Sequence, residues 1–224
     1  MADVVIFGAG RGADVGTRYL RADSDHTIVG YTLDDEYLRE SSYNGLPVVP
    51  WSKVTERFSP ARFKMFAPLG FQRMNELRAE KYIRGKEAGY QFISYISSTV
   101  SSFEHLVTGE NCLILEHNVF NFDVRVGNNV VLWSANHIGD LSVIEDHAWL
   151  SSHVVLAGEV EIGSYAFLGV NATVSNHVRV GERSYIGANA LIGKNTEPDG
   201  VYVVQGTRKS FADSRRFLDL VDPS

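Results

Sequence analysis

The sequence predicts a chain in two parts, a small Rossmann-like βαβαβ domain of α/β type followed by a parallel β-helix. Three observations support this interpretation. A six-residue apolar repeat runs through residues 114–192, a buried strand near the N-terminus leads into a glycine-rich loop, and only about 100 residues precede the repeat. A full dehydrogenase domain needs more chain than that, whereas a small α/β unit fits.

The repeat places a large apolar residue at every sixth position. These anchors are Ile114, Phe120, Val126, Leu132, Ile138, Ile144, Leu150, Leu156, Ile162, Leu168, Val174, Val180, Ile186 and Ile192. A period of six fits neither an α-helix nor a two-sided strand and is typical of a parallel β-helix. Three units should close one triangular coil of about eighteen residues, which gives between four and five coils. The alternative is an ordinary β-sandwich with accidental spacing.

Each unit should place two side chains inside the coil. The second is the small or β-branched residue four positions after the anchor, as at Val130, Ala148 and Ala166. Gly or Ala often follows the anchor, and we expect it where the backbone turns tightly. Because each coil buries its surface only against the next, stability should be shared along the stack.

The region before the repeat alternates strand and helix signals. Strands are expected at Asp3 to Phe7, Thr27 to Tyr31 and Lys64 to Pro68, and Tyr90 to Ile96 should end the domain. Helices are expected from Asp14 to Arg21 and from Asn75 to Gly89, the latter with Leu77, Tyr82 and Ile83 on its apolar face. We therefore predict an α/β domain at residues 1–100 and a β-helix with a tail at residues 101–224.

A G-x-G-x-x-[GA] pattern follows the first strand and opens a helix. Gly8 and Gly10 belong to it, and backbone N–H groups at such a turn can hold phosphates. Arg11 could reach a phosphate, and Asp34 or Asp35, after the second strand, could accept hydrogen bonds from a ribose or base. The alternatives are a tight turn, an exposed arginine and a solvated acidic pair.

Composition narrows the class of protein. A net charge of −6 gives no electrostatic support for nucleic-acid binding. One cysteine excludes an internal disulfide framework and suits a reducing compartment. No apolar run approaches the roughly 18 residues that span a bilayer. We expect a soluble, cytoplasmic protein without membrane insertion.

Five segments carry a resemblance to a known family. They read FGAGRGADVG, YTLDDE, LWSANHIGDLSVIEDHAWLSSHVVLAG, EIGSYAFLGVNATV and GVYVVQGTRKS, and together with the regions between them they cover nearly all of the chain. The chain resembles the left-handed β-helix acyltransferases, and in particular the bacillosamine-pathway and perosamine N-acetyltransferases. The resemblance implies a left-handed β-helix, a homotrimer, and acyl transfer, most simply acetyl, from acyl-CoA to an amino group of a nucleotide-linked deoxyaminosugar. Such products feed bacterial surface glycans or glycoproteins.

Acyl transfer to an amine needs a proton acceptor and donors for the tetrahedral oxyanion. Histidine suits the first role near neutral pH, and His137, His147 and His153 fall within 17 residues. Their spacings match no local metal pair, so we expect no metal. All seven histidines lie off the anchor register.

The resembling family uses a histidine on a coil edge at a subunit interface. Its members often read N-H-I-G-H-H-S where this chain reads Asn136 to Ser142 as NHIGDLS. Asp140 therefore occupies the position of the base. Asp140 could act as base with His137 as proton shuttle, the amine could arrive neutral, or the activity could be lost or changed. We take His137, Asp140 and His147 as catalytic candidates, against structural roles for the histidines.

Coenzyme A lies between adjacent β-helices in the family, which implies a lining of small residues. Gly158, Gly169, Val170, Gly187 and Ala188 match, although these residues also suit coil corners. Arg208 and Lys209 resemble the segment near the adenine and 3′-phosphate, unless they are surface cations. Besides N-acylation, the alternatives are sugar O-acetylation, as in sialic acid O-acetyltransferases, and a silent binding protein.

Overall fold

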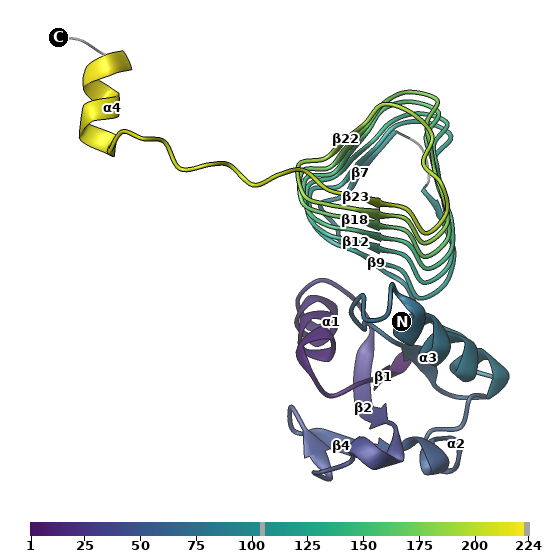
Figure 1. Cartoon of the computed structure of the whole chain (residues 1–224). Helices are drawn as coiled ribbons and strands as arrows, with labels where there is room; N and C mark the ends of the chain where they lie inside the picture. The colour runs from purple at the N-terminus through teal and green to yellow at the C-terminus, as the bar shows by residue number, and fades with distance from the viewer. Residues whose placement is uncertain (104–105, 222–224) are drawn as a thin grey trace.

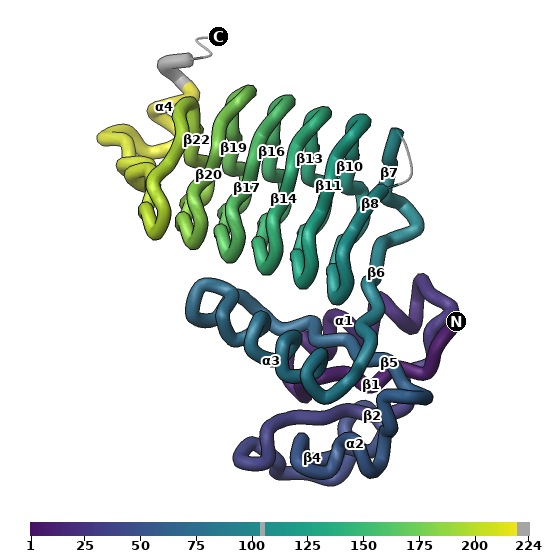
Figure 2. Tube along the Cα trace, turned by 90° about the vertical axis from the view of Figure 1, so that its right-hand side faces the viewer, coloured from purple at the N-terminus to yellow at the C-terminus, as the bar shows by residue number. Residues whose placement is uncertain are grey.

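The computed structural model describes residues 1–103 and 106–221. An N-terminal α/β domain packs against one face of a three-sided parallel β-helix, and a C-terminal tail leaves the far end of that solenoid (Figure 1). Figure 2 shows the coils stacked along one axis, with α3 (Glu76–Glu87) running beneath them. Both predicted parts of the fold are present.

The N-terminal domain has a five-stranded sheet in the order β3-β4-β2-β1-β5. Its strands are β1 (Asp3–Phe7), β2 (Thr27–Leu33), β3 (Ser42–Tyr43), β4 (Leu46–Pro50) and β5 (Lys64–Phe66), and only β3 is antiparallel. The helices are α1 (Arg11–Ala22), α2 (Val54–Arg57), α3 and two short 3₁₀ turns, η1 (Asp35–Tyr37) and η2 (Trp51–Lys53). Helix α1 begins three residues earlier than predicted, because Gly10 is already its N-cap.

The strand predicted from Tyr90 to Ile96 is divided between the two parts. Phe92 bridges Met65 of β5 and so extends the N-terminal sheet. Tyr95 and Ile96 instead form β6, the first strand on one face of the solenoid. The same helix–strand region holds a second difference, since Ile83 of α3 is exposed while Arg78 is fully buried.

The solenoid has three faces of parallel strands. Face 1 contains β6 (Tyr95–Ile96), β9 (Leu113–Ile114), β12 (Val131–Leu132), β15 (Trp149–Leu150), β18 (Phe167–Leu168), β21 (Tyr185–Ile186) and β23 (Val201–Tyr202). Face 2 contains β7 (Ser101–Ser102), β10 (Val119–Phe120), β13 (His137–Ile138), β16 (Val155–Leu156), β19 (Thr173–Val174) and β22 (Leu191–Ile192). Face 3 contains β8 (Val107–Thr108), β11 (Arg125–Val126), β14 (Val143–Ile144), β17 (Glu161–Ile162) and β20 (Arg179–Val180).

Three edges join these faces, and each is a column of four-residue turns. Edge 1–2 follows face 1 and includes residues 115–118, 133–136, 151–154, 169–172 and 187–190. Edge 2–3 includes 121–124, 139–142, 157–160 and 175–178, and edge 3–1 includes 127–130, 145–148, 163–166 and 181–184. The third residue of each turn is left-handed, as at His153 (φ 61°) and Asn171 (φ 59°).

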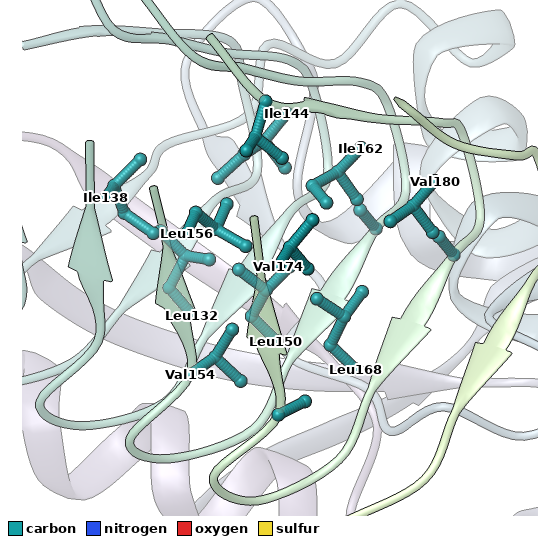
Figure 3. Close-up of a cluster of buried hydrophobic side chains, with 14 of the residues drawn as sticks. Leu132, Ile138, Ile144, Leu150, Val154, Leu156, Ile162, Leu168, Val174 and Val180 are labelled. Atoms are coloured by element: carbon teal, nitrogen blue, oxygen red, sulfur yellow. The ribbon is translucent and has the colours of Figure 1, made fainter. Parts of the chain in front are cut away.

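The apolar repeat fills the interior as predicted. All fourteen anchors are at most 6% exposed, and the residues four positions later are buried with them. Figure 3 shows anchors from three faces converging on the axis, with Leu132, Leu150 and Leu168 stacked in successive coils. This interior is the core on which the edges are built.

The repeated glycines have a different physical role from the one predicted. None of the glycines after an anchor has a positive φ, so the turn itself does not require them. A Cβ added to Gly169 would instead lie 2.6 Å from the backbone nitrogen of Ala188 in the next coil. These glycines allow coils to stack closely, and the left-handed turn position falls two residues later.

The tail begins where face 1 ends. Tyr202 of β23 accepts a hydrogen bond from the N–H of Gly187, and the chain then continues as extended, exposed residues. Helix α4 (Ser214–Val221) follows this segment and lies away from the solenoid (Figure 1).

Candidate functional site

A cavity of about 680 Å³ opens at the carboxyl ends of β1 and β2. Gly8 and Ala9 line it at the end of β1, and Asp34 lines it at the end of β2. Ligands of open parallel sheets bind at this edge, because the loops after the strands leave a crevice there. We name this space the sheet-edge cavity.

The two predicted aspartates have different surroundings. Asp34 is paired with Lys81 at 2.9 Å and with Arg84, so its charge is largely compensated at the cavity wall. Asp35 points to Ser52, whose N–H and hydroxyl donate to the carboxylate and lower the pKa of Asp35. Asp34 lines the sheet-edge cavity and also an adjoining open pocket, whereas Asp35 lines only that second pocket.

A second cavity of about 600 Å³ lies between the N-terminal domain and the solenoid. Gly10, Arg11 and Gly12 at the start of α1 line one side of it. It shares Gly8, Ala9, Leu69 and Leu77 with the sheet-edge cavity, so the two cavities adjoin. We name it the interdomain cavity.

The floor of the interdomain cavity is aromatic. Trp149 is buried beneath it, with Phe71 at 5.3 Å and Trp133 at 6.0 Å between ring centroids. The hydroxyl-bearing Ser151 and Ser152 follow β15 at the far end, on edge 1–2. Sequence reasoning missed this floor. The usable signal was a tryptophan at outward positions beside the anchors Leu132 and Leu150.

Edge 1–2 continues from this floor along the solenoid. Ser151 and Ser152 are followed one coil later by Gly169 and Val170, and two coils later by the pair Gly187 and Ala188. Val170 itself lines the interdomain cavity. Four of the predicted cofactor residues therefore form one column that begins at the cavity.

The tail starts on the same edge. Val203 stacks on Gly187, within 3.0 Å of where a Cβ would lie. Arg208 and Lys209 are exposed farther along the extended segment. Among the described residues, neither has an ion-pair partner, so both remain available to an anion.

The other predicted residues lie elsewhere on the solenoid. His137 is exposed on face 2, and Asp140 lies on edge 2–3. The Asp140 carboxylate sits beside Gly158, 3.0 Å from where a Cβ would be. Neither His137 nor Asp140 lines the interdomain cavity of its own chain.

His147 is part of the joint between the two domains. Its Nδ1 lies 2.8 Å from the amide nitrogen of Asn129, whose oxygen already accepts from Asn111. Asn129 must therefore donate, and His147 must accept as a neutral ring. Burial lowers the pKa of His147 to about 4. The structure places His147 away from both His137 and the cavities.

We expect the folded protein to lose stability in acid because His147 is buried as a neutral ring. The folded pKa of about 4 lies below the ordinary value of 6.5, so the unfolded chain binds more protons between these values. The contribution of His147 to the free energy of unfolding is therefore fully present above pH 6.5 and is lost as the pH falls toward 4. At pH 5 the loss from this group should be about 2 kcal/mol. Comparing urea unfolding at pH 7 and pH 5 for the wild type and His147→Gln isolates it, since equal pH dependence would contradict the assignment.

Similar proteins are known for the fold. Residues 161–194 match the family model of the bacterial transferase hexapeptide (six repeats). A search of curated protein sequences found no match. The chain is similar to a histidine variant of perosamine N-acetyltransferase from Caulobacter crescentus, in complex with CoA and GDP-perosamine, with a TM-score of 0.79 and 22% identity over 90% of this chain and 93% of that one. The fold is that of the left-handed β-helix acetyltransferases.

Two further structures support the same fold. The acetyltransferase domain of PglB from Neisseria gonorrhoeae has a TM-score of 0.76 at 20% identity, over 89% of this chain and 95% of that one. WeeI from Acinetobacter baumannii has a TM-score of 0.74 at 14% identity, over 90% and 96%. None of the described helices has the length and apolar character of a membrane span.

Proposed function

We propose that the protein is an acyl-CoA-dependent N-acyltransferase that acts on the amino group of a nucleotide-linked deoxyaminosugar. The carrying observation is that the sheet-edge cavity adjoins the interdomain cavity, whose lining in turn includes Ser152 and Val170 of edge 1–2. A nucleotide sugar is long enough to need both cavities, and a thioester carrier would approach along the edge.

The two cavities and edge 1–2 offer each part of the substrate suitable chemistry. Gly8 and Asp34 face the space for the nucleoside, and Asp34 can accept from ribose hydroxyls. The start of α1 has Gly10 as an N-cap without a side-chain cap, so its first N–H groups and Arg11 suit a diphosphate. The Asp35 carboxylate already accepts a hydrogen bond from Ser52, so Asp35 would not bind the nucleoside directly but would hold the loop that carries Asp34 in place. The sugar would then lie on the aromatic floor.

The acyl-CoA would lie along the small residues of edge 1–2. Gly169, Val170, Gly187 and Ala188 leave room for a pantetheine arm, and Arg208 and Lys209 suit the phosphates. In the solved structures CoA accompanies GDP-perosamine for one relative, and acetyl coenzyme A is present with the PglB domain. Those ligands support the choice of acetyl-CoA as first co-substrate to test.

A homotrimer would add edge 2–3 of a second copy to this site. His137, Asp140 and Gly158 lie on that side of the solenoid and would reach the substrate only from a neighbour. His147 would support the site through the domain joint. The oligomeric mass, measured by light scattering, tests the trimer separately from activity.

Turnover with defined substrates tests the proposal. Thiol release from acetyl-CoA should require a nucleotide-linked deoxyaminosugar, with GDP-perosamine as the first probe, and mass spectrometry should find an acetamide product. The analogue with a hydroxyl in place of the amine is the matched control. Faster turnover of that analogue would assign O-acylation instead, and tight binding of the nucleotide sugar without thiol release would assign a binding protein.

A further inference from the structure

One histidine lies next in sequence to the lining of the interdomain cavity. His153 follows Ser151 and Ser152, the last floor residues of the interdomain cavity, in the same edge 1–2 turn. Its side chain is exposed, and among the described residues it has no hydrogen-bond or ion-pair partner. His153 is not itself among the residues that line the interdomain cavity, but it directly follows Ser152 at the end where the column of small residues begins.

The other described histidines are placed differently. His147 is buried in the domain joint, and His177 is paired with Glu159 on edge 2–3 at 3.2 Å. His137 is on face 2, and burial near the N-terminus lowers the pKa of His26. His117 shares the column of His153 but lies two coils away from it, outside the cavity lining. His153 alone among them adjoins residues that line the cavity.

We propose that His153 is the catalytic base of this acyltransferase, an inference that rests on the function proposed above. The turn position fixes it there, because the left-handed backbone (φ 61°) and the hydrogen bond from its N–H to the carbonyl of Ser134 set the direction of the residue. Ser151 and Ser152 line the same cavity as Trp133 and Trp149, so a sugar on this floor would bring its amine to the turn that holds His153. This assignment explains how Asp140 can stand at the position where resembling sequences have histidine.

With His153 of edge 1–2 as the base, acyl transfer proceeds as follows. The imidazole of His153 takes a proton from the substrate ammonium, and the amine lone pair forms the C–N bond with the thioester carbonyl carbon while its π electrons move to oxygen. The second amine proton passes to solvent as the tetrahedral intermediate collapses, because the imidazolium already carries the first. The C–S bond breaks, and the imidazolium returns a proton to the leaving CoA thiolate. Acyl group and electrons are conserved, and no oxidant or metal is needed.

His153→Asn is the decisive variant, because Asn occupies the same left-handed position at Asn171 and Asn189 in the next coils. With acetyl-CoA and the accepted aminosugar nucleotide, kcat should fall about 100-fold or more, while KM for the sugar nucleotide changes less than about twofold. The acid limb of the wild-type pH–rate profile should disappear. Imidazole added to His153→Ala should restore part of the rate.

Two matched variants make the result specific. His117→Asn makes the same substitution in the same column and should keep full activity. Asp140→Asn, measured in the same assay, tests the competing assignment of the base to Asp140. Full activity of His153→Asn with loss in Asp140→Asn would overturn the inference and assign the base to a neighbouring copy. Absence of wild-type turnover with any aminosugar nucleotide would instead overturn the proposed function.

Discussion

Replacing Arg78 with methionine should lower the free energy of unfolding by about 3 kcal/mol. Arg78 is fully buried on α3 and donates to the carbonyls of Gly70, Asn129 and His147 at 3.0, 3.2 and 2.7 Å. Among the described residues, none of these three carbonyls accepts another hydrogen bond, and each buried unpaired carbonyl costs about 1–3 kcal/mol. Burial lowers the pKa of Arg78 to about 9, which shows that the buried cation is itself costly. Removing that cost with methionine offsets part of the stability lost with the hydrogen bonds.

The control lies on the same helix. Ile83 is exposed, and Ile83→Ala should change stability by less than about 0.5 kcal/mol. Calorimetry gives the change in melting temperature, and hydrogen exchange of α3 amides reports the joint itself. A methionine variant as stable as the wild type, with unchanged protection of α3, would mean that apolar packing rather than hydrogen bonding holds the domains together.

Adding a single methyl group at Gly12 should damage both stability and substrate binding. In Gly12→Ala the new Cβ would lie 2.1 Å from the carbonyl oxygen of Pro68, so α1 must move away from the loop that lines both cavities. Such overpacking should cost about 3 kcal/mol. The shift also displaces the N–H groups that we assign to the diphosphate, and the affinity for a nucleoside diphosphate should fall at least tenfold by calorimetric titration.

Gly10→Ala provides the comparison for this effect. A Cβ at Gly10 meets nothing within 4 Å, and its φ of −140° suits any residue, so stability should be unchanged. Alanine favours helices over glycine by about 1 kcal/mol. Helix propensity alone would thus make Gly12→Ala more stable than the wild type. A raised melting temperature for that variant would contradict the close contact between α1 and Pro68.

The solenoid was predictable because its sequence signal is a fixed spacing of apolar residues and does not depend on the strand propensity of any segment. Anchors such as Leu132 and Leu150 recur every eighteen residues on one face, and only a stacked coil buries that pattern. The glycine loop was predictable for a similar reason, since the order of strand, Gly8 and helix fixes the sheet edge. Strand limits within the linker were not, because Tyr90 to Ile96 reads as one β segment while two different sheets share it.

The site was only partly predictable, because its assembly depends on the docking of two domains. The column from Gly169 to Ala188 followed from the repeat, but the aromatic floor of Trp149 and Phe71 forms across a contact that the sequence does not reveal. Likewise, nothing in the pattern of α3 indicated that Arg78 would be buried among backbone carbonyls. His147, expected near the reacting groups, instead completes a ladder with Asn111 and Asn129.

Because the coils stack regularly, each coil adds a constant distance along edge 1–2. Neighbouring parallel strands lie about 4.8 Å apart, so the two coil steps from Ser152 through Val170 to Ala188 span roughly 10 Å before the tail departs. Inserting or deleting one whole coil above Ser152 would carry Arg208 and Lys209 farther from or nearer to the cavity by one such step. Under the function proposed above, the number of coils would set the length of the carrier that the cavity and the tail can hold together.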